Sequence, residues 1–128
     1  MKARRRVLIV EDNADLRRLY AIGLNQRGYE VKLAANGAEA IDRIEADPPD
    51  VIILDLVMPI MDGWEVIERI TPPPGSPGRE IPVIVVTGFT EPADRPLAQQ
   101  VVAWLAKPAS LDEIAVKLTE IEALESAS

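Results

Sequence analysis

The sequence predicts an α/β fold: a doubly wound parallel sheet of five strands with helices on both faces. Apolar runs of strand length alternate with segments of helical periodicity along the whole chain. Such alternation implies parallel strands joined by right-handed crossovers. Three of the runs, "VLIV", "VIIL" and "VIVV", carry no polar residue on either face. These three runs are therefore expected to be central strands with helices packed above and below them.

The first two strands are expected to flank an amphipathic helix. Residues 6–10, "RVLIV", form an apolar run that stops at an acidic pair. A helix is expected over 14–28, with Gly28 placed to end it. The apolar side chains at helical spacing in this segment are Leu16, Leu19, Tyr20 and Leu24. Residues 30–34, "EVKLA", alternate as the strand at a sheet edge does.

The middle of the chain repeats this pattern. Asn36-Gly37 is interpreted as a turn, and a helix is expected over 38–46. The next strand is expected over 50–54, "DVIIL", and the next helix over 64–70, "WEVIERI". Trp64, at the start of that helix, is interpreted as a packing residue, with a docking role as the alternative.

A proline-rich stretch, "TPPPGSPGRE" at residues 71–80, follows this helix. It is interpreted as a stiff loop at the end of the sheet away from the functional site, and the alternative is a polyproline ligand for another module. A strand is expected over 81–88, where a proline at the start is tolerated. Pro92 and Pro96 weaken the next helix, which is expected to be short or irregular.

The last two elements are a strand and a helix. Residues 100–108, "QVVAWLAKP", are expected to form the fifth strand. A helix is expected over 110–124, with Ser110 as its N-cap. Its apolar stripe consists of Leu111, Ile114, Ala115, Leu118 and Ile121.

Composition excludes several kinds of chemistry. The chain has no cysteine and no histidine, which removes disulfides, thiolate metal sites and the usual general base. Its formal net charge of -7 argues against nucleic acid as a partner. A length of 128 residues with 48% hydrophobic residues fits one domain, taken as residues 1–128.

The basic segment at residues 1–6, "MKARRR", is a local exception to the acidic composition. It is interpreted as a solvated lead-in to the first strand, and the alternatives are a signal n-region or a patch for an anionic partner. Only four apolar residues follow before the acidic pair, so no membrane span is expected. A cytoplasmic location is expected, in agreement with the absence of cysteine.

Three carboxylates are expected to meet at one end of the sheet. Glu11 and Asp12 follow the first strand, and Asp55 follows the third. The functional site of a doubly wound sheet lies beyond the carboxyl ends of the strands, where the strand order reverses. Clustered carboxylates repel one another unless a cation compensates them, and oxygen ligands alone select a hard ion. Mg2+ is therefore the expected cofactor.

Two further polar residues end neighbouring strands. Thr87 ends the strand over 81–88, and Lys107 ends the strand over 100–108. A hydroxyl, an ammonium and a divalent cation around one carboxylate compensate the oxygens of a phosphoryl group during transfer. Asp55 is the candidate nucleophile that would accept this group as an acyl phosphate.

The motifs "IVED", "ILDLVMPIMDG", "VVTG" and "WLAKP" together resemble the receiver domain of bacterial two-component response regulators, of the single-domain chemotaxis-regulator type. The resemblance covers roughly residues 5–124 and implies the flavodoxin-like strand order 2-1-3-4-5. It also implies a signalling switch that is not an enzyme, with a sensor histidine kinase or phosphotransfer protein as its phosphodonor. The output protein is unknown, and a weak homodimer is possible.

The same resemblance assigns roles residue by residue. It implies that Asp55 is the phosphoacceptor and that Glu11 and Asp12 bind Mg2+ with it. The backbone carbonyl of Val57 would be a further metal ligand. Thr87 would be the switch hydroxyl and Lys107 the cation that pairs with the phosphoryl group.

Further implications concern the last strand and the lifetime of the phosphoryl group. Trp104 falls at the family's switch aromatic, with an ordinary edge-strand aromatic as the alternative. The Lys107-Pro108 bond resembles one that is commonly cis. Val57 and Phe89 occupy positions that tune the phosphoryl lifetime in the family; both are apolar and cannot activate water, so slow self-dephosphorylation is expected.

Two alternatives to the switch are kept. A phosphohydrolase with an aspartyl intermediate generally carries a second aspartate two residues after the nucleophile, and Val57 at that position argues against turnover. A pseudo-receiver would be an interaction module that no longer takes phosphate. The chain ends directly after the helix over 110–124, so a stand-alone receiver and a fragment of a longer regulator or hybrid kinase are both expected possibilities.

Overall fold

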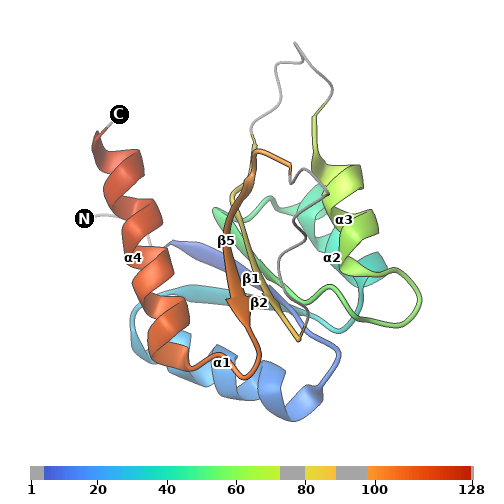
Figure 1. Cartoon of the computed structure of the whole chain (residues 1–128), viewed down its shortest axis with the longest axis horizontal. Helices are drawn as coiled ribbons and strands as arrows, with labels where there is room; N and C mark the ends of the chain where they lie inside the picture. The colour runs from blue at the N-terminus through green and yellow to red at the C-terminus, as the bar shows by residue number, and fades with distance from the viewer. Residues whose placement is uncertain (1–4, 73–79, 89–97, 128) are drawn as a thin grey trace.

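A computed structural model describes residues 5–72, 80–88 and 98–127 (Figure 1). The strands are β1 (Arg6–Val10), β2 (Glu30–Ala34), β3 (Val51–Leu54), β4 (Val83–Thr87) and β5 (Val101–Ala106). The helices are α1 (Ala14–Gln26), α2 (Gly37–Ala46), α3 (Gly63–Ile70) and α4 (Leu111–Ala127). All strand pairs are parallel, in the order β2-β1-β3-β4-β5. The predicted fold class and strand order are confirmed.

The central strands alternate their side chains between two hydrophobic cores. On β1, Val7 and Ile9 belong to the core under α1 and α4, whereas Leu8 and Val10 belong to the core under α2 and α3. β3 and β4 alternate in the same way, and every residue of both strands is buried. Figure 1 shows α1 and α4 on one side of the sheet and α2 and α3 on the other. Burial on both faces explains why these strands read as continuous apolar runs.

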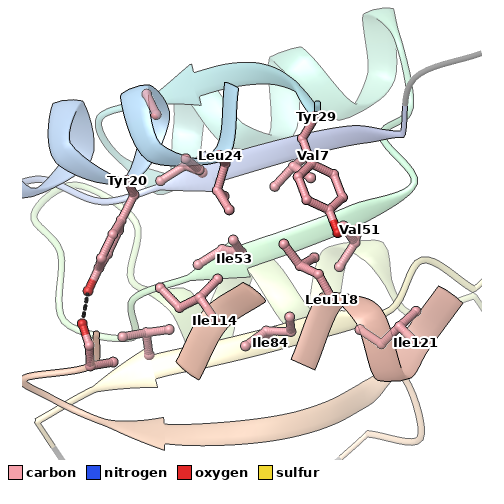
Figure 2. Packing of buried hydrophobic residues seen from close by; sticks show 14 residues of the cluster. Val7, Tyr20, Leu24, Tyr29, Val51, Ile53, Ile84, Ile114, Leu118 and Ile121 are labelled. Atoms are coloured by element: carbon pink, nitrogen blue, oxygen red, sulfur yellow. Dashed lines mark hydrogen bonds between the residues drawn. The ribbon is translucent and has the colours of Figure 1, made fainter. Parts of the chain in front are cut away.

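Figure 2 shows the core under α1 and α4. Tyr20 and Leu24 of α1 meet Ile114 and Leu118 of α4 above the strands (Figure 2). Leu19, which falls on helical spacing with them, is 60% exposed. The prediction that Leu19 lies on the buried face is wrong. The next residue, Tyr20, is buried there, and because successive side chains on a helix differ in direction by about 100°, Leu19 points to solvent.

Capping residues set where the helices begin. Asn36 was interpreted as a turn residue, but its side chain accepts a hydrogen bond from the N–H of Glu39 and caps α2, which begins at Gly37. Asp62 caps α3 in the same way, and Ser110 Oγ accepts from Glu113 N–H at 3.1 Å at the start of α4. The cap predicted at Ser110 is confirmed. Gly28, two residues after the end of α1, has φ +96°, as expected of a residue that ends a helix.

Two predictions concern segments outside the residues that the structure describes. The short or irregular helix expected around Pro92 and Pro96 falls on residues 89–97, and most of the proline-rich loop falls on residues 73–79. None of the helices in the described part of the chain is both long and apolar enough to cross a bilayer.

Candidate functional site

Backbone hydrogen bonds align the strand ends that carry the predicted site residues. The N–H of Glu11 donates to Ala34 O at 3.1 Å, and the N–H of Asp55 donates to Val10 O at 3.0 Å. Because β1 lies between β2 and β3, these bonds continue the parallel ladders for one residue past the strands. Glu11 and Asp55 therefore emerge side by side at the carboxyl edge of the sheet.

The three predicted acidic residues form one cluster. Each of Glu11, Asp12 and Asp55 offers a carboxylate oxygen, and these oxygens lie within 4.8 Å of one another. Glu11 is 3% exposed and Asp55 5% exposed, whereas Asp12 is exposed to solvent. Because Glu11 and Asp55 are buried and Asp12 faces solvent, a solvated ion can reach the cluster from the side of Asp12.

Lys107 is the cation of this cluster. Its Nζ lies 2.8 Å from Glu11 Oε1 and 2.9 Å from Asp55 Oδ2. Its backbone N–H donates to Thr87 O at 2.8 Å, which holds the residue at the end of β5. Burial alone would lower the pKa of the Lys107 ammonium, but the hydrogen bonds to Glu11 and Asp55 outweigh it and hold that pKa above its ordinary value.

The charges of the cluster do not cancel. Burial raises the pKa of the Glu11 carboxyl, and the hydrogen bond from Lys107 opposes this rise. With all groups ionised, three carboxylates and one ammonium leave two negative charges at the site. This charge and an all-oxygen donor set suit a hard divalent cation that keeps part of its water shell.

Thr87 carries a buried hydroxyl without a hydrogen-bond partner among the described residues. The residue ends β4 and is fully buried. No group in the described part of the chain hydrogen-bonds its Oγ1. An unpaired buried hydroxyl is costly, so this donor is available to a ligand at the strand ends.

The loop between β3 and α3 folds back tightly beside Asp55. The N–H of Val57 donates to Asp55 Oδ1 at 3.1 Å, and the Val57 side chain is 53% exposed. The N–H of Met61 donates to Pro59 O at 2.8 Å, which places Ile60 at the centre of a γ-turn with φ +72°. Gly63 ends the loop where a Cβ would lie 2.6 Å from Asp55 O. The metal-ligand role expected of the Val57 carbonyl remains a prediction.

Trp104 lies on β5 and is partly buried on the face covered by α2 and α3. Its ring meets the ring of Trp64, from α3, with centroids 6.0 Å apart and an interplanar angle of 43°. Trp64 is partly buried too, in agreement with the interpretation as a packing residue. The Lys107-Pro108 peptide bond is cis, as expected.

Sequence reasoning missed two residues that support the acidic pair. Arg17 Nη1 donates to the carbonyl oxygens of Glu11, at 2.7 Å, and of Asp12, at 3.4 Å. The N–H of Asn13 donates to Glu11 Oε2 at 3.1 Å, and its side chain caps α1. The position of Asn13 before an amphipathic helix was a visible signal of a cap. Arg17 gave none, because a cation in the first turn of a helix is usually solvated.

A parallel sheet with an acidic cluster, a lysine and a threonine at its strand ends is a doubly wound α/β domain whose candidate site lies at the carboxyl edge of the strands. The family model for the response regulator receiver domain matches residues 7–119. The chain therefore belongs to the receiver domain family of two-component response regulators. Domains of this family act as signalling switches.

Individual relatives agree with this assignment. Response regulator MprA of Mycobacterium avium is 34% identical over 115 residues, which cover 88% of this chain and 49% of MprA. The structure of the chemotaxis response regulator CheY4 of Vibrio cholerae superposes with a TM-score of 0.79 at 29% identity, covering 93% of this chain and 99% of CheY4. The chain spans about half the length of the curated relatives it matches.

A third relative was solved with ligands. The response regulator TrrA of Thermotoga maritima, in complex with Mg2+ and BeF, superposes with a TM-score of 0.77 at 27% identity. The match covers 91% of this chain and 97% of that structure.

Proposed function

We propose that this chain is a phosphoacceptor switch in which Asp55 receives a phosphoryl group from a phosphohistidine in a Mg2+-dependent reaction. The donor would be a sensor histidine kinase or a phosphotransfer protein. The observation that carries the proposal is the contact of Lys107 Nζ with Asp55 Oδ2 at 2.9 Å. Thr87, at the end of β4, adds a buried hydroxyl with no hydrogen-bond partner among the described residues. An acceptor carboxylate, a cation and a free donor at one edge of the sheet are the groups that phosphoryl transfer requires.

The transfer step uses the carboxylate of Asp55 as nucleophile. One Oδ attacks phosphorus in line with the phosphorus–nitrogen bond of the phosphohistidine; the phosphorus–oxygen bond forms as the phosphorus–nitrogen bond breaks. The electron pair of the broken bond stays on the imidazole nitrogen of the donor, and because the other ring nitrogen carries a proton, the donor leaves as a neutral imidazole. The ammonium of Lys107 and the hydroxyl of Thr87 stabilise the charge on the phosphoryl oxygens.

The residues of the acidic cluster fit Mg2+. Glu11, Asp12 and Asp55, together with the carbonyl of Val57, would hold it, and their donors are all oxygen. Bound there, Mg2+ would neutralise negative charge on the carboxylates and on the incoming phosphoryl group. The related TrrA, solved in complex with Mg2+ and BeF, supports this choice of ion.

Phosphorylation would act by shifting the population between two conformations. The new charge at Asp55 would attract the hydroxyl of Thr87, and Trp104 on the adjacent strand would change its packing. The changed surface would bind an output protein, or a second copy of the chain in a weak homodimer. A phosphohydrolase is not supported, because the exposed apolar side chain of Val57 offers no general acid beside Asp55.

Intact mass of the protein after incubation with acetyl phosphate tests the proposal, with and without Mg2+. We expect one phosphoryl adduct that requires Mg2+ and is lost in Asp55→Asn. Asp47→Asn, an exposed acid paired with Arg6 and outside the cluster, is the matched control and should keep the adduct. No adduct on the unsubstituted protein under any condition would favour a pseudo-receiver instead.

A further inference from the structure

The side chain of Tyr20 joins α1 to the loop between β5 and α4. Tyr20 is 2% exposed, and its hydroxyl donates a hydrogen bond of 2.9 Å to the backbone carbonyl of Ala109 (Figure 2). The contact is buried and links residues 89 positions apart in the sequence. Because Ala109 follows Lys107 by two residues, this bond holds the backbone from which the Lys107 side chain projects.

The loop is fixed at both of its ends by other bonds. The N–H of Lys107 donates to Thr87 O at 2.8 Å, and Ser110 Oγ accepts from the N–H of Glu113 at 3.1 Å. Between these points, the hydroxyl of Tyr20 satisfies the Ala109 carbonyl, and Ala109 is itself buried. Without the hydroxyl this buried carbonyl would lose its hydrogen-bond partner. A movement of the loop that brings the carbonyl to water or to another donor would then lower the free energy.

The helix that carries Tyr20 also holds the acidic side of the site. Arg17, one turn earlier on α1, donates to the carbonyl of Glu11 at 2.7 Å. Helix positions three apart share a face, so α1 contacts the loop of Glu11 with one residue and the loop of Lys107 with the other. Burial, with the nearby charge of Glu11, raises the pKa of the Tyr20 phenol, so the hydroxyl remains a donor at neutral pH.

We propose that Tyr20 is a positioning residue for Lys107: its hydrogen bond to Ala109 keeps the ammonium in contact with Asp55. This inference rests on the proposed function, in which that contact stabilises phosphoryl transfer. Tyr20 does not touch the reacting atoms; its effect reaches them through the loop. Small displacements of a supporting group lower rates strongly when the group acts through a fixed geometry.

The test compares Tyr20→Phe with Tyr29→Phe. Tyr29 is a second buried tyrosine of the same hydrophobic core and lies toward the other end of α4 (Figure 2). With acetyl phosphate and Mg2+, Tyr20→Phe should lower the maximal phosphorylation rate about tenfold, as loss of a supporting hydrogen bond does at other sites. The half-saturating donor concentration should not change, and Tyr29→Phe should match the unsubstituted protein.

A double-mutant cycle separates positioning from a general structural effect. In a Lys107→Ala background, Tyr20→Phe should cause no further loss of rate, because the residue it positions is gone. An equal loss in both backgrounds, or an unchanged rate in Tyr20→Phe alone, would overturn the proposal. If the variant is unfolded at the assay temperature, the measurements are repeated in trimethylamine N-oxide, which favours the folded state.

A second readout does not depend on phosphorylation. The NMR signal of the Lys107 side chain should shift toward that of a solvated lysine in Tyr20→Phe and stay in place in Tyr29→Phe. An unmoved signal would refute the positioning role even if the unsubstituted protein takes no phosphoryl group. Absence of an adduct on the unsubstituted protein, with the expected shift present, would instead count against the proposed function.

Discussion

At the scale of single residues, Thr87 combines burial with an unmet hydrogen bond. Its Oγ1 has no partner within the described residues, although the residue is fully buried. A buried hydroxyl without a partner lowers stability and is retained where a ligand supplies the partner. In the proposed switch that partner is a phosphoryl oxygen on Asp55.

Replacing Thr87 with valine should therefore stabilise the unphosphorylated protein by about 1 kcal/mol, because it removes the unpaired hydroxyl at similar volume. The free energy of unfolding in urea measures the effect. Thr71→Val is the control: the Thr71 hydroxyl donates to Ile67 O at 2.6 Å, so its loss should destabilise. A loss of stability in Thr87→Val as large as in the control would mean that the Thr87 hydroxyl is paired in solution.

Ile60 is a second residue whose conformation opposes its side chain. It is a β-branched residue at φ +72° and is 82% exposed, so no burial compensates the strained backbone. Ile60→Asn should raise the free energy of unfolding by about 1 kcal/mol, since asparagine tolerates positive φ better. Val57→Asn, in the same loop but outside the positive-φ residues, should give no such gain. Thermal unfolding of both variants decides between relief of strain and a general effect of polarity.

Val57 also bears on the lifetime of the proposed acyl phosphate. Its apolar, exposed side chain lies two residues after Asp55 and cannot orient an attacking water. Discharge of the phosphorylated protein should be slow, and Val57→Asn should accelerate it several-fold. Discharge followed by intact mass measures both rates; a half-life of seconds that the substitution leaves unchanged would contradict the prediction. Phe89, the other position expected to act on the lifetime, lies outside the described residues.

At the scale of elements, the start of α3 depends on close packing against the strand that carries Asp55. A Cβ at Gly63 would lie 2.6 Å from Asp55 O and 2.7 Å from Leu56 Cα, both backbone atoms that cannot turn away. The N–H of Gly63 also donates to Leu56 O at 3.0 Å. The glycine lets α3 begin directly beside the proposed acceptor.

Gly63→Ala should cost about 1–3 kcal/mol of stability, as overpacking against a fixed backbone does. Gly88→Ala is the matched control, because a Cβ there meets no atom of the described residues within 4 Å. Urea unfolding of the two variants gives the comparison. Equal free energies of unfolding for the two variants would show that the backbone at Asp55 and Leu56 moves to make room for the added Cβ.

The elements also show where local patterns were ambiguous. Asn-Gly occurs both in turns and at helix starts. At Asn36 it starts a helix, because the Asn36 side chain accepts a hydrogen bond from the backbone N–H of Glu39. Leu19 and Tyr20 are adjacent on α1, and the structure buries Tyr20 in the core with α4 while Leu19 stays exposed. The spacing of apolar residues predicts that one face of the helix is buried, but it does not decide which of two adjacent residues lies at the middle of that face.

At the scale of the whole molecule, binding of Mg2+ should be linked to folding. The cluster of Glu11, Asp12 and Asp55 brings residues from two strand ends together, so the unfolded chain offers no comparable site. Mg2+ at one hundred times its dissociation constant should add about 2.7 kcal/mol to the free energy of unfolding. Asp12→Asn should reduce this gain and Asp47→Asn should not. Equal gains in both variants would place the ion elsewhere.

The sequence alone determined the alternation of strands and helices along the described residues and the central position of the three apolar strands. It also determined that one edge of the sheet carries the candidate site residues, which are Glu11, Asp12, Asp55, Thr87 and Lys107. Periodicity reports which faces are buried, and parallel strands bring their carboxyl ends to the same edge. The contacts that support the site were decided by the tertiary structure: Arg17 on the Glu11 carbonyl, Tyr20 on Ala109 and the ring of Trp64 against Trp104. Each joins side chains or backbone groups whose distance depends on how helices pack across the twisted sheet, and that distance is not encoded in spacing along the chain.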